Sequence, residues 1–161
     1  MKDSKRRFRL RESVTPKEWK AYVDMKKIVA DSKVYPEGVK MYQDRIKRGE
    51  DIGAITLIKH PKEDLYAVLD GHHRFYAYSN MGIERTKCIV VPDPVGFLFT
   101  LTKDGMLQPT EEFTQYVRVP FKKLEGFLYD FLNRPEELLK RKLLMRRKKS
   151  HNPHSYRLML I

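Results

Sequence analysis

Leu65-Tyr66-Ala67-Val68-Leu69-Asp70-Gly71-His72-His73-Arg74-Phe75-Tyr76-Ala77 is the stretch on which the fold depends. Its first five residues form an apolar run that Asp70-Gly71 breaks, so the pattern predicts a buried strand that ends there. Residues 72–81 have the apolar spacing of a helix, and Gly82 is the expected stop with a positive φ angle. A helix start carries unpaired N–H groups and a partial positive charge, so this stretch predicts a phosphate site.

The segment from Asp70 to Ala77 resembles the signature of the ParB/sulfiredoxin superfamily, in which a strand runs into a Gly-x-x-Arg-x-x-Ala box at a helix start. The resemblance covers roughly residues 35–92. It implies that the box holds nucleotide phosphates, which belong to CTP in ParB partition proteins, to ATP in sulfiredoxins, and to ADP or ATP in free-serine kinases. The residues alone leave a second interpretation open, in which His72 and His73 only cap the helix.

The box differs from those of two branches of the superfamily. Sulfiredoxins carry their reactive cysteine directly after the glycine, and His72 stands at that position, so sulfinic-acid reductase activity is not expected. ParB proteins carry a Glu-Arg-Arg triplet there, of which only Arg74 remains. The form at residues 70–74 looks closer to the free-serine-kinase branch, in which the Asp before the Gly is implicated in catalysis. The resemblance thus implies an ATP- or ADP-dependent phosphotransferase that acts on a small hydroxyl compound.

Phosphoryl transfer requires donors around the phosphate, often Mg²⁺, and a carboxylate that orients or deprotonates the acceptor hydroxyl. The expected nucleotide-binding donors are the N–H groups after Gly71, the guanidinium of Arg74, and His72 or His73. Asp70 is expected to hold Mg²⁺ or to act as the base. A hydrolytic or binding-only site would use the same donors.

Glu37 is the second candidate for the catalytic base, because the resemblance implies a catalytic Glu ahead of the strand expected at residues 52–58. Its other interpretation is a solvated loop residue. A metal site built from His60, His72 and His73 with Asp70 matches no standard zinc spacing.

The composition limits the class of protein. A chain of 161 residues fits one domain with appendages. It has no run of about 18 apolar residues and no apolar core of a signal peptide near its start, so a membrane span and secretion are not expected. A single cysteine, Cys88, lies in an apolar run and is expected to be a buried thiol. We therefore expect a cytoplasmic protein.

The positive charge lies at the two ends of the chain. The formal net charge is +12, and residues 1–11 and 140–161 contribute +5 and +8, which leaves about −1 between them. Any nucleic-acid contact is therefore expected at the ends, and the candidate residues are Arg141, Arg146, Arg147, Lys148 and Lys149. A solvated helix end and a helix on anionic lipid remain alternatives.

Further elements are predicted around the box. Thr15-Pro16-Lys17-Glu18 reads as a capping box that starts a helix to Ala30, with Trp19 in the core. A second helix is expected from Val39 to Arg48, and strands are expected at residues 52–58 and 84–91.

The second half carries no motif. We expect a strand or short helix over residues 94–101, a turn at 102–105, a short helix from Thr110 and an extended segment at 117–121. The apolar segment 124–132 is expected to be core or a homodimer contact. Asn133 is a candidate cap for a final helix that runs to about Lys149.

Together these patterns predict an α/β (α+β) fold of ParB/sulfiredoxin type, a small mixed sheet flanked by helices with a C-terminal helical extension. The expected parts are a basic arm or edge strand (1–14), the ParB/sulfiredoxin-like domain (15–105) and the extension with its basic tail (106–161). The leading function is nucleotide-dependent phosphoryl transfer with Mg²⁺. The alternative is a non-catalytic, nucleic-acid-binding, partition-like module that uses ATP, ADP or CTP as a switch.

Overall fold

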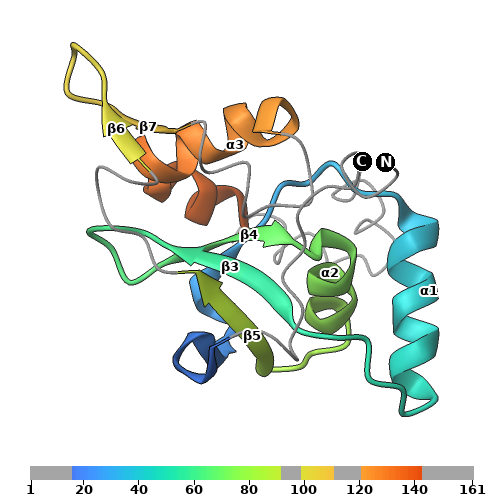
Figure 1. The fold of residues 1–161 in the computed structure, drawn as a ribbon. Helices are drawn as coiled ribbons and strands as arrows, with labels where there is room; N and C mark the ends of the chain where they lie inside the picture. The colour runs from blue at the N-terminus through green and yellow to red at the C-terminus, as the bar shows by residue number, and fades with distance from the viewer. Residues whose placement is uncertain (1–15, 92–98, 111–120, 143–161) are drawn as a thin grey trace, which may run out of the picture.

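The computed structural model describes residues 16–91, 99–110 and 121–142, and it has the predicted α/β architecture (Figure 1). The main sheet contains β1 (Lys20–Asp24), β2 (Ile28–Val29), β3 (Ile55–Lys59), β4 (Tyr66–Asp70) and β5 (Arg85–Val91). The other elements are the 3-10 turns η3 (Lys17–Trp19) and η4 (Met25–Lys27), the helices α1 (Pro36–Lys47), α2 (His72–Asn80) and α3 (Phe121–Asn133), and the hairpin strands β6 (Phe99–Leu101) and β7 (Leu107–Pro109).

The five strands of the main sheet lie in the order β1-β5-β3-β4-β2. The outer strand β1 is antiparallel to β5, and β3 is antiparallel to β4 but parallel to β5. The sheet is therefore mixed, as predicted. β4, the strand that ends at the glycine box, lies inside the sheet between the edge strand β2 and the central strand β3. β3 is the strand expected to precede it.

The helix predicted from Thr15 to Ala30 is wrong for the described part of this segment. The chain instead forms η3, β1, η4 and β2 in succession. Along β1 only Val23 is buried, and residues 20–22 are exposed. Residues 20–24 pair with β5 along their whole length. This tertiary pairing outweighs the local helix signal that Pro16 and Glu18 supply.

α1 and α2 lie side by side on one face of the sheet (Figure 1). Leu57, Val68 and Cys88 point into the core on this face together with Phe75 of α2. Val39 of α1 packs against Ala77 of α2, which has the small side chain that close packing requires. α1 begins three residues earlier than expected because Pro36 occupies its first turn.

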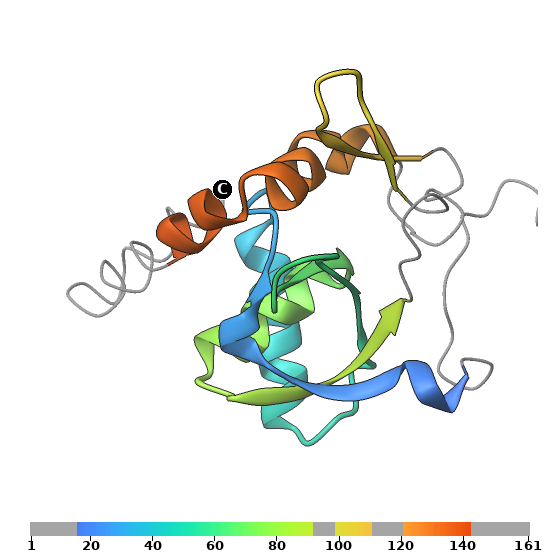
Figure 2. The ribbon, with the colours of Figure 1, turned by 90° about the vertical axis from the view of Figure 1, so that its left-hand side faces the viewer.

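α3 covers the opposite face of the sheet. The strand residues that face this side alternate with those of the first face. They are Ile58, Ala67 and Leu69, and they share a buried core with Leu128 and Phe131 of α3. The apolar segment 124–132 is therefore a core helix. The predicted boundary between residues 105 and 106 stays a prediction, and it falls inside the β6–β7 hairpin, whose turn contains Gly105 with a φ of 81° (Figure 2).

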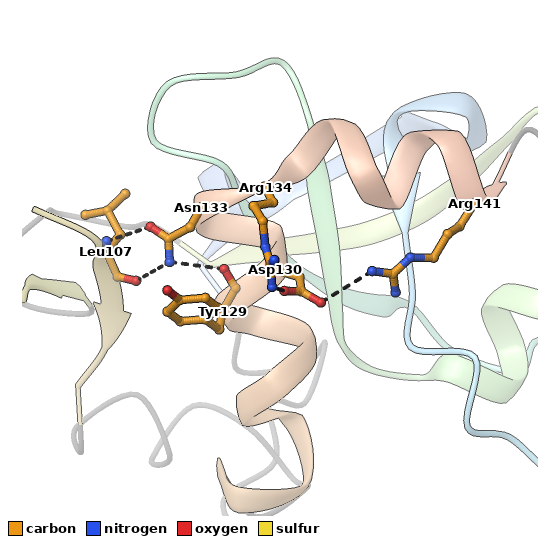
Figure 3. Close-up of polar contacts among 6 residues, drawn as sticks. All are labelled: Leu107, Tyr129, Asp130, Asn133, Arg134 and Arg141. Atoms are coloured by element: carbon orange, nitrogen blue, oxygen red, sulfur yellow. Dashed lines mark hydrogen bonds and ion pairs between the residues drawn. The ribbon is translucent and has the colours of Figure 1, made fainter. Parts of the chain in front are cut away.

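Asn133 ends α3 and does not cap the next helix, so the predicted role is wrong. Its side-chain oxygen accepts a hydrogen bond of 2.7 Å from the Leu107 N–H, and its amide donates to the carbonyl oxygens of Leu107 and Tyr129 (Figure 3). These bonds attach the hairpin to α3. A helix does follow at residues 135–142.

Cys88 is buried as expected, and burial raises the pKa of its thiol to about 12, so it stays protonated and unreactive.

Within the described residues, no helix combines the length and the apolar character that a bilayer span requires. The predictions for residues 1–15, 94–98, 111–120 and 143–149 lie outside the described residues.

Candidate functional site

The first turn of α2 is an uncapped helix start. Gly71 precedes the helix with a φ of 102°, and its carbonyl oxygen accepts the first helical bond, from the Phe75 N–H, at 2.8 Å. No side chain caps this turn and it contains no acidic residue. The N–H groups of residues 72–74 therefore keep the partial positive charge that attracts an anion. The left-handed φ of Gly71 requires glycine, and a Cβ atom there would also lie 2.8 Å from Nη2 of Arg74.

The start of α1 lies directly beside the start of α2. The Tyr35 N–H, at the N-cap of α1, donates a hydrogen bond of 3.0 Å to Nε2 of His73. The two rings are stacked with 10° between their planes and 6.2 Å between their centroids. Gly38 of α1 is so close that a Cβ atom would lie 2.7 Å from Cδ2 of His73. Two positive helix ends therefore meet at one place, and His73 joins them.

His73 is neutral in this arrangement. Burial lowers the pKa of its imidazole, and Nε2 accepts the bond from Tyr35, so the proton of the neutral ring is on Nδ1. The sequence prediction treated His73 as a donor to phosphate. The structure gives Nε2 a different partner and leaves Nδ1–H as the ring's donor.

His72 carries a buried polar atom without a partner. Its Nε2 is inaccessible to solvent and makes no hydrogen bond. Burial lowers the pKa of His72 to about 4, although the nearby Asp70 charge opposes this shift. The ring meets Phe127 of α3 edge to face, with centroids 6.2 Å apart. Phe127, which no sequence motif marked, thus brings α3 into contact with the box.

Arg74 is turned into the protein. Its side chain is 7% exposed, and Nη1 donates to the carbonyl oxygens of Ile52 and Ala54 at 3.3 and 2.8 Å. Nη2 lies 3.6 Å from Oδ2 of Asp70. The guanidinium therefore ties the turn at Gly71 to the chain segment ahead of β3. Its predicted contact with phosphate stays a prediction.

The two candidate carboxylates flank the helix starts. The Asp70 side chain is 16% exposed at the end of β4 and faces Arg74. Glu37 is exposed in the first turn of α1, between Tyr35 and Gly38, both of which contact His73. The structure thus brings Glu37 to the same end of the two helices as residues 70–74. Their catalytic roles stay predictions.

His60 does not join this site. Its Nδ1 accepts hydrogen bonds from the N–H groups of Lys62 and Glu63, and Nε2 lies 3.1 Å from the carbonyl oxygen of Leu132. The ring is a buried link between the β3–β4 turn and α3. In the part of the chain that the structure describes, no group of three His, Cys, Asp or Glu residues could hold a metal ion, so the alternative that joins His60, His72 and His73 with Asp70 is not formed.

Of the predicted nucleic-acid residues, the structure describes Arg141 alone. Its guanidinium lies 3.5 Å from Asp130, which also pairs with Arg134 at 2.6 Å (Figure 3). The neighbouring Lys142 donates to the carbonyl oxygens of Met25 and Ile28 and lies over the Phe75 ring. These two cations therefore already have partners within the fold. Residues 146–149 lie outside the described residues, and nucleic-acid binding stays a prediction.

Parts of the chain are similar to solved structures from the ParB/sulfiredoxin superfamily. A free serine kinase in complex with AMP is 22% identical over 48% of this chain and 32% of its own, with a TM-score of 0.43. ParB from Caulobacter crescentus, complexed with CTP-gamma-S, is 12% identical over 47% of this chain and 45% of its own, with a TM-score of 0.41. Sulfiredoxin from Arabidopsis thaliana is 19% identical over 46% and 85%, also with a TM-score of 0.41.

These three proteins represent the branches to which the signature at residues 70–77 is similar. The chain spans about a third of the length of the free serine kinase chains. No family model and no curated protein matches the sequence. Similarity at this level concerns the arrangement of the elements and says nothing about activity.

Proposed function

We propose that this protein binds a nucleotide by its phosphates at the joined starts of α1 and α2, and transfers a phosphoryl group to a small hydroxyl compound. The observation that supports this best is the hydrogen bond between Tyr35 and His73, which holds two helix starts together. A helix start carries a partial charge of about +0.5. The first turn of α2 contains no acidic residue to offset it, whereas the first turn of α1 contains Glu37. Phosphate is the ligand class for which such starts are suited.

His72 supports the same ligand. A buried polar atom without a partner costs about 1–3 kcal/mol, and Nε2 of His72 is such an atom in the first turn of α2. The neutral imidazole can place its proton on Nε2 and donate it to a phosphate oxygen. A bound anion would recover the hydrogen bond that the free protein lacks.

Two carboxylates are available for the transfer chemistry. The acceptor hydroxyl oxygen forms a bond to the terminal phosphorus as the bond to the departing nucleotide breaks, and the hydroxyl proton goes to a carboxylate. Glu37 suits this proton-accepting role because it is exposed beside the helix starts.

Asp70 fits the role of a magnesium ligand. Magnesium sites at phosphates use one or two carboxylates and complete their shell with water and phosphate oxygens. The Asp70 carboxylate at the end of β4 would be one such ligand, and Arg74 holds it in place. Bound Mg²⁺ would neutralise phosphate charge.

The test is calorimetric titration of the full chain with ATP, ADP and CTP, each with and without Mg²⁺. We expect saturable binding that weakens about 10- to 100-fold in His72→Ala, because a hydrogen bond to a charged group contributes about 1.5–3 kcal/mol. Lys47→Ala is the matched control, since it removes an exposed cation at the far end of α1. Absence of binding to all three nucleotides would overturn the proposal.

A further inference from the structure

We propose that the Tyr35 ring is the surface on which the base of the nucleotide stacks, so that the ligand is a nucleoside phosphate and not a simple phosphate or polyphosphate. This inference rests on the proposed function, because it takes the phosphates to lie at the joined helix starts. It assigns a role to a residue that carries no charge and lies outside the glycine box.

Tyr35 is an exposed aromatic residue beside the helix starts. Its side chain is 74% exposed, a value that single surface aromatics often reach without any function. Its surroundings set it apart, because its backbone N–H is bonded to His73 and its ring is stacked nearly parallel to the His73 ring. The centroids of the two rings are 6.2 Å apart, so the Tyr35 ring lies beside the helix starts and leaves most of its surface open to a planar ligand.

The position of the ring matches the geometry of a nucleotide. His73 is the second residue of α2, and its ring lies between the first turn of that helix and Tyr35. A phosphate on the first-turn N–H groups would therefore have Tyr35 one side chain away, within reach of the sugar and base of the same ligand. Stacking on an aromatic ring suits any base, because every base has a π face.

Tyr22 provides the contrast within the same chain. It is 72% exposed, nearly the same as Tyr35, but it lies on the edge strand β1 opposite Lys87. Exposure is thus matched between the two tyrosines, while proximity to the helix starts is not. This pair makes the inference testable with a built-in control.

The experiment is calorimetric titration of the full chain with ATP and with inorganic tripolyphosphate, on the unmodified protein and on Tyr35→Ala, Tyr35→Phe and Tyr22→Ala. We expect Tyr35→Ala to bind ATP about 10- to 100-fold more weakly, the usual effect of removing a stacking ring, and to bind tripolyphosphate unchanged. Tyr35→Phe and Tyr22→Ala are expected to bind both ligands as the unmodified protein does.

Three results would overturn the inference, and they separate it from the proposed function. Unchanged ATP affinity in Tyr35→Ala would show that the base does not stack there, while the proposed function would stand. An equal loss for ATP and tripolyphosphate would show that Tyr35 acts on the helix start and not on the base. No binding of either ligand to the unmodified protein would remove the proposed function and this inference with it. Thermal unfolding of each variant verifies that it is folded.

Discussion

Nε2 of His73 accepts a hydrogen bond of 3.0 Å from the backbone N–H of Tyr35. The two residues are 38 positions apart in the chain, and their bond joins the starts of α1 and α2. The donor is one of the groups that a helix start leaves unpaired. The bond brings the start of α1 beside the N–H groups of residues 72–74 in the first turn of α2. Pro36 has no N–H and the Gly38 N–H donates to the Tyr35 carbonyl oxygen, so the donors for an anion come mainly from α2. The proposed phosphate site depends on this arrangement.

Gly38 tests how tightly the two helix starts are packed. In Gly38→Ala the new Cβ atom would lie 2.7 Å from the His73 ring. We expect the variant to be less stable by about 1–3 kcal/mol, as for other overpacked sites, and to bind nucleotide more weakly. Denaturant unfolding and calorimetry measure the two effects.

Gly126→Ala is the matched control, because nothing lies within 4 Å of the added Cβ atom in α3. We expect it to stabilise the protein by about 0.5–1 kcal/mol through helix propensity. In the double variant Gly38→Ala/His73→Ala the loss should shrink, since the clashing ring is absent. A loss of the same size with and without the His73 ring would contradict the packing explanation.

Asp70→Asn and Glu37→Gln separate binding from chemistry. If Asp70 holds Mg²⁺, Asp70→Asn should abolish turnover and spare Mg²⁺-free nucleotide binding, because the amide loses the charge that the metal requires. Glu37→Gln should lower turnover with little change in nucleotide affinity, because the amide cannot take up the hydroxyl proton. Product formation from ATP and a panel of small hydroxyl compounds measures turnover.

Asp70→Asn also alters the contact with Arg74, so its thermal unfolding must be compared with that of the unmodified protein. A folded Asp70→Asn variant with an unchanged rate would eliminate the assigned role of Asp70. The same result for Glu37→Gln would eliminate Glu37 as the base.

The three histidines His60, His72 and His73 make stability depend on pH. Burial lowers the pKa of each in the folded state, and the pKa of His72 falls from 6.5 to about 4. The unfolded chain therefore binds more protons below pH 6.5 than the folded one. The contribution of the neutral histidines to the free energy of unfolding is complete above about pH 6.5 and is lost as the pH falls toward 4. For His72 the loss reaches about 3 kcal/mol, because each pH unit between the two pKa values corresponds to about 1.36 kcal/mol.

Denaturant unfolding at pH 8, 6.5 and 5 measures this loss before carboxylates begin to titrate. In His72→Phe the ring is kept beside Phe127 but cannot titrate, so the loss between pH 6.5 and 5 should be smaller. Equal free energies of unfolding at pH 8 and pH 5 would contradict the prediction.

Lys142 is predicted to be structural despite lying in a basic segment. Its ammonium group donates to the carbonyl oxygens of Met25 and Ile28, so Lys142→Met should remove both bonds and cost about 1–3 kcal/mol. Lys140→Met is the control, since Lys140 is 70% exposed, and it should change stability by less than about 0.5 kcal/mol. Equal effects of the two variants would contradict the structural role.

This contact also decides how the basic tail should be tested. Removing residues 140–161 would remove Lys142 and destabilise the fold, whereas removing residues 143–161 leaves it. We expect the shorter deletion to keep the melting temperature. If the tail binds nucleic acid, the same deletion should abolish a binding that weakens as salt rises.

Local patterns were sufficient for the central part of the fold. The apolar run before Asp70, the break at Gly71 and the stop at Gly82 predicted β4 and α2 almost to the residue. The pattern was misleading at residues 15–30, where a capping box is a signal of the first turn only. The strand found there depends on pairing with β5, more than 60 residues later in the chain, and no local pattern contains that partner.

The sequence by itself determined the strand, the glycine turn and the helix start at residues 65–80, because backbone conformation there follows from neighbouring residues. Tertiary structure alone decided what the side chains of the box do. The Arg74 guanidinium donates to the carbonyl oxygens of Ile52 and Ala54. Nε2 of His73 accepts a hydrogen bond from the Tyr35 N–H, and Phe127 packs against His72. The physical reason is that buried polar groups must find partners, and those partners are set by which distant segments the packing of α1 and α3 brings to the helix start.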